Sequence, residues 1–261
     1  MNEITFDREG TELFAMETGQ GDALVFLHGG LADHRSTLLR LGSLAASHRV
    51  IAPDVRASGR SIFAGALSWD LLADDVAALL DHLRIARAVI GGASMGSAIA
   101  TRFALRYPHR LRGLVLVMPA FAGRDLAPSL AQREAFALMD AHAQRAVIEG
   151  IEAMRPLYER VPPPMRERAI GMMRSFDPAS VAATTRLLVS GAQPFEHAVE
   201  LAAIDAPAIV VPGTDPEHPA EVATIYAEHL RNATLADPMQ DLAVLVGDFC
   251  RSLPKGTVEV H

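Results

Sequence analysis

Short apolar runs alternate with helix-like stretches along most of the chain, and this alternation predicts a mostly parallel β-sheet flanked by helices. Three runs, 24–27, 114–117 and 209–211, are apolar at every position, as expected for strands that helices cover on both faces. The predicted fold class is therefore α/β with a central sheet. The predicted strands are Thr11–Glu17, Ala23–Leu27, Val50–Ala52, Ala88–Ile90, Leu114–Met118, Ala208–Val211 and Ala233–Leu235.

The strand pattern stops between Phe121 and Ile204, where the residues read as helices interrupted by prolines. This indicates a helical cap, 121–204, inserted into a core formed by 1–120 and 205–261. Methionines recur at helical spacing within the predicted cap. Such spacing is typical of a core face, and the flexible side chains would also suit the roof of a pocket.

Composition narrows the classes of partner. The 261 residues carry a formal net charge of −7 without a block of Lys and Arg, which argues against nucleic acid as a partner. The longest apolar runs are about half as long as a membrane span requires. The first ten residues lack the basic and apolar segments of a secretory signal. We therefore expect a cytoplasmic protein that acts on a small molecule and has no membrane partner.

Metal, cofactor and thiol chemistry find little support in the sequence. The chain contains no phosphate-binding loop, zinc-binding helix or calcium-loop motif, so no cofactor and no metal are predicted. Cys250 is the only cysteine, which excludes an intrachain disulfide, and we expect it to fill a helix face. The neighbouring acids Asp74 and Asp75 are expected on a solvated helix face.

A serine between two glycines is the strongest candidate for chemistry. Residues 92–96 read Gly-Ala-Ser-Met-Gly and lie between the strand 88–90 and a helix-like stretch, 97–107. The pattern is typical of a nucleophile elbow, a strained turn that pushes a serine hydroxyl out of the backbone while the glycines avoid clashes. The bare motif is moderately specific, so its context decides.

The context resembles the α/β-hydrolase superfamily from about Thr11 to Leu253, with four motifs in the expected order. They are His28-Gly29-Gly30 after the strand 23–27, an Asp-x-Arg-x-x-Gly-x-Ser segment at 54–61, the elbow around Ser94, and Pro-Gly-Thr-Asp-Pro at 212–216. The resemblance implies an α/β-hydrolase fold with a serine nucleophile, a histidine base and a carboxylic acid.

The resemblance also implies roles for individual residues. Ser94 would be the nucleophile, and the oxyanion would be held by the N–H of Met95 and that of Gly30 or Leu31. Asp215 follows the strand 208–211 and resembles the triad acid. An Asp-Pro pair also suits the start of a helix, so both readings of Asp215 stand.

The family's base normally lies in a loop after the last strand, and this sequence has no such loop. The strand 233–235 passes almost directly into Asp237-Pro238, which predicts a helix N-cap, a proline at the first helical position and a helix that runs through Phe249. No histidine occurs between His229 and His261. The usual mechanism therefore lacks its base at the usual place.

Two other histidines fall near the predicted site. His218, three residues after Asp215, is the best substitute base, but it equally suits a turn before a helix that starts near Pro219. His28 is expected to brace the oxyanion loop rather than to take part in catalysis. A water molecule or a group of the substrate is a further alternative to a histidine base, so the sequence leaves the base open.

Two hypotheses about function follow. The first is a hydrolase of small carboxylic esters, lactones or related carbonyl compounds, with Ser94 as nucleophile, Asp215 as acid and a non-standard or absent histidine base. The second is a hydrolase-like scaffold that has lost catalysis and binds a small ligand or a protein partner beneath the cap. A lyase that uses the same pocket is a third option. The cap residues Arg155, Tyr158 and Arg186 are expected at the surface or in packing, with contact to an anionic substrate as the alternative.

Overall fold

The computed structural model describes residues 1–254, and an eight-stranded sheet of order β1-β2-β4-β3-β5-β6-β7-β8 forms its centre. The pairs β1–β2 and β2–β4 are antiparallel, and the other pairs are parallel. The strands are β1 (Asn2–Arg8), β2 (Thr11–Thr18), β3 (Ala23–Leu27), β4 (Arg49–Pro53), β5 (Ala88–Ala93), β6 (Leu111–Val117), β7 (Ala208–Val211) and β8 (Ala233–Leu235).

The predicted α/β class and the mostly parallel sheet are confirmed, and every predicted strand is present. The pattern did not predict β1, an edge strand that buries only Ile4 and Phe6 and alternates them with exposed residues. Within β3, Leu24 and Phe26 pack on one face of the sheet and Val25 and Leu27 on the other. This explains why the central strands are apolar at every position.

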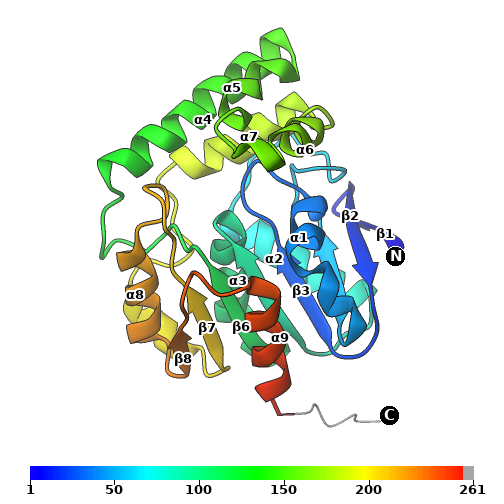
Figure 1. The fold of residues 1–261 in the computed structure, drawn as a ribbon, viewed down its shortest axis with the longest axis vertical. Helices are drawn as coiled ribbons and strands as arrows, with labels where there is room; N and C mark the ends of the chain where they lie inside the picture. The colour runs from blue at the N-terminus through cyan, green and yellow to red at the C-terminus, as the bar shows by residue number, and fades with distance from the viewer. Residues whose placement is uncertain (255–261) are drawn as a thin grey trace.

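Helices cover both faces of the sheet (Figure 1). One face carries α1 (His34–Leu41), the 3₁₀ turn η1 (Gly42–Ala46) and α9 (Leu242–Ser252). The other face carries α2 (Trp69–His82), α3 (Met95–Arg106) and α8 (Ala220–His229). A short 3₁₀ turn, η2 (Pro108–Arg110), leads from α3 into β6. None of the helices in residues 1–254 has both the length and the hydropathy needed to cross a bilayer.

Between β6 and β7 the chain leaves the sheet, and its helices gather over one end of the sheet (Figure 1). Here we call α4 to α7 the cap helices. Met154, Tyr158, Met173 and other residues of these helices form an apolar cluster separate from the two clusters that cover the sheet. The elements of this segment are α4 (Leu130–Glu149), η3 (Ile151–Met154), α5 (Arg155–Tyr158), α6 (Pro163–Met173), α7 (Pro178–Val189) and η4 (Ala198–Ala203).

Two local predictions are wrong. The last helix starts at Leu242 with Asp241 as its N-cap, because the Asp237 side chain instead accepts from the Met239 N–H and forms a separate turn. Asp75 does not lie on a solvated face: it is buried and pairs with the Arg56 guanidinium through two 2.8 Å hydrogen bonds. The buried cation holds this acid inside the protein. Cys250, by contrast, packs into a helix face as predicted.

Candidate active site

The junction of β5 and α3 holds Ser94 in a strained turn. Its backbone has φ 53° and ψ −117°, a region that non-glycine residues rarely adopt. The two flanking glycines make the turn possible: a Cβ on Gly92 would lie 2.3 Å from the Gly96 carbonyl, and one on Gly96 would lie 2.4 Å from the Leu27 carbonyl. The predicted clash-avoiding role of these glycines is therefore confirmed.

The structure brings a histidine to this serine. His218 Nε2 lies 2.8 Å from Ser94 Oγ, and His218 Nδ1 lies 2.8 Å from Asp215 Oδ1. Both ring nitrogens are thus engaged, one by a hydroxyl and one by a carboxylate. If the neutral ring carries its proton on Nδ1, Asp215 accepts that proton's hydrogen bond and Nε2 is free to accept from Ser94.

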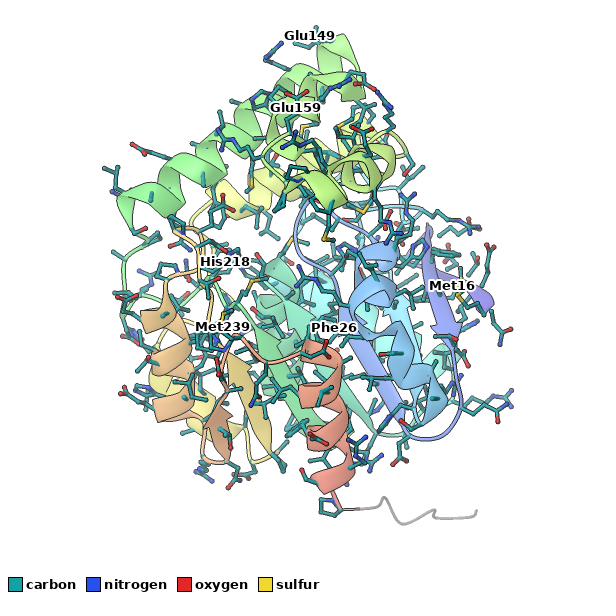
Figure 2. All side chains as sticks on the ribbon, viewed as in Figure 1. Met16, Phe26, Glu149, Glu159, His218 and Met239 are labelled. Carbon is teal, nitrogen blue, oxygen red and sulfur yellow. The ribbon has the colours of Figure 1, made fainter. Side chains whose placement is uncertain are left out.

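Asp215 and His218 come from the same short turn. The turn connects β7 to α8, and His218 lies beneath the cap helices (Figure 2). Asp215 Oδ1 also accepts from the backbone N–H groups of Glu217 and His218, which fixes the carboxylate within the turn. The Asp215 side chain is 43% exposed, whereas that of His218 is 11% exposed. The Asp215 carboxylate is therefore reached by solvent, whereas the His218 ring is shielded from it.

The turn between β7 and α8 is tightly packed at Gly213. A Cβ on Gly213 would lie 2.2 Å from the carbonyl oxygen of His218 and 2.3 Å from its Cβ. Glycine at this position lets the turn fold back far enough to carry the ring to Ser94. The sequence did not reveal this requirement, because Gly213 belongs to a motif expected for the acid alone.

The loop after β3 lies against the nucleophile. A Cβ on Gly29 would lie 3.4 Å from Ser94 Cβ. Within residues 1–254 the N–H groups of Gly30 and Leu31 both donate to no backbone carbonyl, so both candidates for this donor stand. Met95 is the first residue of α3, where a helix leaves its N–H without an intrahelical partner. Leu31 has φ 59°, a left-handed conformation that its side chain disfavours.

His28 forms hydrogen-bond contacts that join the loop after β3 to the segment after β4. Its Nδ1 lies 2.7 Å from the Gly29 carbonyl oxygen, and its Nε2 accepts from the Val55 N–H at 3.0 Å. Burial lowers the pKa of His28 and outweighs the nearby Asp54 carboxylate, which acts in the opposite direction. These contacts match the bracing role expected for His28.

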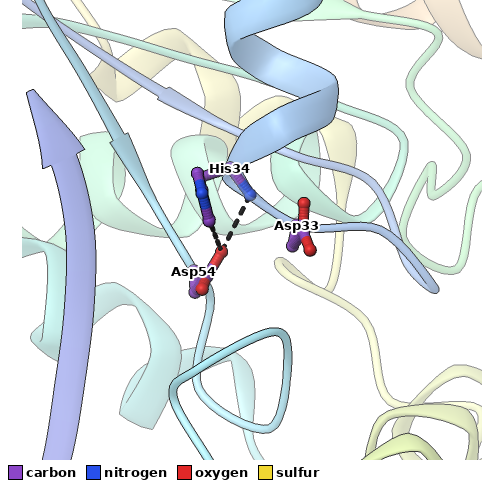
Figure 3. Close-up of side chains that lie close together, drawn as sticks. All are labelled: Asp33, His34 and Asp54. Atoms are coloured by element: carbon purple, nitrogen blue, oxygen red, sulfur yellow. Dashed lines mark hydrogen bonds and ion pairs between the residues drawn. The ribbon is translucent and has the colours of Figure 1, made fainter. Parts of the chain in front are cut away.

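Asp33, His34 and Asp54 form a neighbouring cluster whose side chains approach one another closely (Figure 3). His34 donates to Asp54 Oδ1 from its backbone N–H, and its Nδ1 lies 2.8 Å from the same oxygen. The other Asp54 oxygen accepts from the Arg60 N–H. Burial opposes ionisation of Asp54, but the His34 hydrogen bond, the His28 ring and backbone donors together lower its pKa.

Asp33 differs from Asp54 in its partners. It caps α1 by accepting from the Arg35 N–H, and it accepts again from the Arg35 guanidinium. Every carboxylate oxygen of the cluster is therefore already an acceptor from the protein. The cluster joins the start of α1 to the Asp54–Ser61 turn, and it is occupied by these contacts rather than open to a cation.

Two of the cavities formed by residues 1–254 are large enough for part of a small molecule, and the lining of each consists of residues other than Ser94, Asp215 and His218. One of about 480 Å³ lies between the start of α2, α7 and the segment that leads to η4, and Trp69, Arg102 and Phe195 are among its lining residues. The second, of about 240 Å³, borders the His218 turn at Pro219 and is lined mostly by apolar residues, among them Phe121, Leu126 and Val222. The second cavity is related to the Ser94–His218 pair through Pro219, the residue that follows His218 in the sequence.

The three cap residues considered as anion contacts lie in different surroundings. Tyr158 is buried, and its hydroxyl donates to the Leu31 carbonyl at 2.6 Å. Arg155 pairs with Glu159 at the surface, and Arg186 is exposed on α7. Tyr158 and Arg155 thus follow the surface-or-packing expectation. The contact between Tyr158 and the oxyanion loop was not predicted.

A family model described as the alpha/beta hydrolase fold matches residues 22–159. The chain is 42% identical over 109 residues to the dihydrolipoyllysine-residue acetyltransferase component of the acetoin cleaving system of Pseudomonas putida, a match covering 41% of this chain and 29% of that protein. It is 34% identical over 116 residues to the 2-hydroxy-6-oxo-2,4-heptadienoate hydrolase of Pseudomonas putida strain F1, covering 41% of each. The chain thus spans less than half the length of these curated relatives.

Solved structures are similar over nearly the whole chain. A thermophilic esterase from Thermogutta terrifontis, studied with malate bound, superposes with a TM-score of 0.76 at 26% sequence identity. That similarity covers 96% of this chain and 97% of the esterase. The similarity to the esterase therefore extends well beyond residue 159, where the match to the family model ends.

Proposed function

Since this chain belongs to the α/β-hydrolase fold family, we propose that it is a serine hydrolase of small carboxylic esters or lactones. Ser94 is the nucleophile, His218 the base and Asp215 the acid. The observation that carries the proposal is the 2.8 Å distance between Ser94 Oγ and His218 Nε2, within a hydrogen-bonded chain that ends at Asp215. Geometry of this kind, rather than sequence position, identifies a serine–histidine–acid unit.

The first half of the reaction forms an acyl-enzyme. His218 Nε2 takes the proton from Ser94 Oγ while the oxygen attacks the substrate carbonyl carbon, and the carbonyl oxygen becomes an oxyanion. The N–H of Met95 and that of Gly30 or Leu31 donate to that oxyanion. Collapse of the tetrahedral intermediate breaks the bond to the leaving oxygen, which receives the proton from His218.

The second half releases the acid. His218 takes a proton from a water molecule, whose oxygen attacks the acyl carbon and forms a second oxyanion held by the same donors. The bond to Ser94 Oγ then breaks, the proton returns to Ser94, and a carboxylic acid leaves. Asp215 keeps the ring in one tautomer and stabilises the imidazolium that forms in each half.

The neighbouring cavity and the comparisons support small substrates. The cavity of about 240 Å³ beside Pro219 suits a short acyl or alkyl chain because most of its lining is apolar. The esterase with the whole-chain similarity supports ester hydrolysis. The similarity to a 2-hydroxy-6-oxo-2,4-heptadienoate hydrolase extends the candidates to related carbonyl compounds. We favour hydrolysis over the scaffold without catalysis, since that alternative rested on the lack of a base.

The test is hydrolysis of p-nitrophenyl butyrate by the wild-type protein and by Ser94→Ala, His218→Asn and Asp215→Asn. We expect the first two variants to lose about 10⁴-fold or more in kcat, because removing the nucleophile or the base disables the whole unit. A fluorophosphonate probe should label the wild type at Ser94 and fail to label Ser94→Ala. His109→Asn, a change at an exposed histidine outside the site, is the control. Wild-type turnover by Ser94→Ala would refute the nucleophile, and wild-type turnover by His218→Asn would refute the base.

A further inference from the structure

One hydrogen bond joins the cap helices to the loop that holds the proposed oxyanion donors. The Tyr158 hydroxyl, at the end of α5, donates to the Leu31 carbonyl at 2.6 Å across 127 residues of sequence. The Leu31 side chain packs against the apolar cluster of the cap helices, of which Tyr158 is a member. The cap helices and the turns between them therefore contact both the backbone and the side chain of a proposed catalytic position.

Leu31 needs such support because its backbone is strained. Its φ of 59° lies in the left-handed region, where the Cβ of a leucine crowds the backbone. Rotation about the N–Cα bond of Leu31, which is its φ angle, turns the Gly30–Leu31 peptide. That peptide carries the Leu31 N–H. A hydrogen-bonded carbonyl and a half-buried side chain packed on the cap cluster leave this N–H little freedom to turn.

Tyr158 is suited to hold this carbonyl at any pH at which the protein is folded. Its side chain is 6% exposed, and burial raises the pKa of its hydroxyl far above the usual value, so the hydroxyl keeps its proton. A second link between the cap helices and the same segment runs through Arg35, whose guanidinium donates to the Ser175 hydroxyl at 2.6 Å. That link is exposed, and it attaches to the start of α1 beyond the oxyanion loop.

We propose that Tyr158 is a positioning residue that holds the Leu31 N–H in the direction required by the oxyanion, so that the cap helices contribute to transition-state stabilisation. The inference rests on the proposed serine hydrolase activity. Because an oxyanion exists in the transition state and not in the bound ester, this role predicts an effect on kcat with little effect on KM. A purely structural role would lower thermal stability and leave the kinetic constants of the folded protein unchanged.

The experiment compares Tyr158→Phe with Tyr107→Phe. Tyr107 is a matched control because its hydroxyl also donates one hydrogen bond, at 2.7 Å to Asp74, far from the site along α3. We expect Tyr158→Phe to lower kcat for p-nitrophenyl butyrate about tenfold with KM within about twofold, less than the roughly 10²–10³-fold loss that follows removal of an oxyanion donor. Butylboronic acid, a mimic of the tetrahedral intermediate, should bind about tenfold more weakly. Tyr107→Phe should change neither constant.

The outcomes separate this inference from the proposed function. If the wild type shows Ser94-dependent hydrolysis and Tyr158→Phe retains wild-type kcat and boronate affinity, the positioning role is wrong and the hydrolase stands. If the wild type shows no Ser94-dependent hydrolysis, both fall. A rise in KM alone, with kcat and boronate affinity unchanged, also overturns the positioning role. Should Tyr158→Phe fail to fold, Leu31→Ala, which removes the contact of the same loop with the cap cluster, replaces it with the same expected kinetic loss.

Discussion

Replacing Gly213 by alanine should displace the proposed base while leaving the Ser94, His218 and Asp215 side chains chemically unchanged. The new Cβ would lie 2.3 Å from His218 Cβ and 2.2 Å from the His218 carbonyl oxygen, where ordinary contact begins at 3.4 Å. No side-chain rotation can relieve these contacts, because the atoms belong to the backbone of His218 or are attached directly to it. Gly213 is not left-handed, so alanine brings no other backbone penalty.

The size of the clash sets the expected effect. His218 has to move by about 1.2 Å for its carbonyl oxygen, now 2.2 Å from the new methyl group, to reach ordinary contact at 3.4 Å. A shift of that size along the 2.8 Å bond to Ser94 would take the pair out of hydrogen-bond range. Misplacement of a catalytic group by about 1 Å can cost about 10²-fold in rate, so we expect kcat/KM to fall about a hundredfold.

The assay is hydrolysis of p-nitrophenyl butyrate together with the rate of labelling by a fluorophosphonate. Gly171→Ala is the matched control: it lies within α6, a Cβ there meets nothing within 4 Å, and alanine should leave kinetics unchanged while favouring the helix. Thermal melts establish that both variants are folded. A folded Gly213→Ala protein with wild-type kcat/KM would refute the reasoning, since the base would then tolerate the displacement or lie elsewhere.

Two further predictions concern stability. The folded protein keeps His28 neutral because burial lowers its pKa, whereas the unfolded chain takes up a proton there near pH 6.5. The free energy of unfolding should therefore decrease as pH falls below about 6.5, by up to about 1.4 kcal/mol per pH unit from this group, until the folded pKa is reached. His28→Gln should flatten this slope in urea denaturation between about pH 5 and pH 8, and an unchanged slope would exclude His28 as its source. Asp75→Leu should cost about 3 kcal/mol in the same assay, because it removes the carboxylate from the buried Arg56 guanidinium. The double variant Arg56→Met with Asp75→Leu should recover part of that loss, and a double variant less stable than Asp75→Leu would contradict this explanation.

The parts of the site that the sequence predicted are those encoded by a few neighbouring residues. The elbow at Ser94, the glycine loop after β3 and the acid turn after β7 each combine a strand end with a short motif, so local geometry determines them. The family resemblance is confirmed for the same reason. His218 was the best available base from its position, but the direction of its ring depends on Gly213 and on how β7 lies relative to β5, which no local pattern contains.

Other features were not predicted from the sequence. Some depend on contacts between residues far apart in the chain, and one depends on which of two similar helix-cap residues starts a helix. Tyr158 was expected at the surface or in packing, and its hydrogen-bond partner Leu31 lies 127 residues away. Asp75 was expected on a solvated helix face because it is adjacent to another acid, Asp74. Its hydrogen bonds to the buried Arg56 guanidinium place it inside the protein instead. The start of α9 was misplaced because Asp237 and Asp241 both suit a helix cap, and only the second has a helix to cap.

The placement of acid and base on one turn also affects how the site assembles as the chain folds. Asp215 and His218 are three residues apart, so closing their contact restricts only a short loop and can occur as soon as the turn forms. The contact of His218 with Ser94, by contrast, joins positions 124 residues apart. Assembly of the three residues thus requires one long-range contact instead of two. We expect the acid–base pair to be present early in folding, and the nucleophile to join it when β5 and β7 take their places in the sheet.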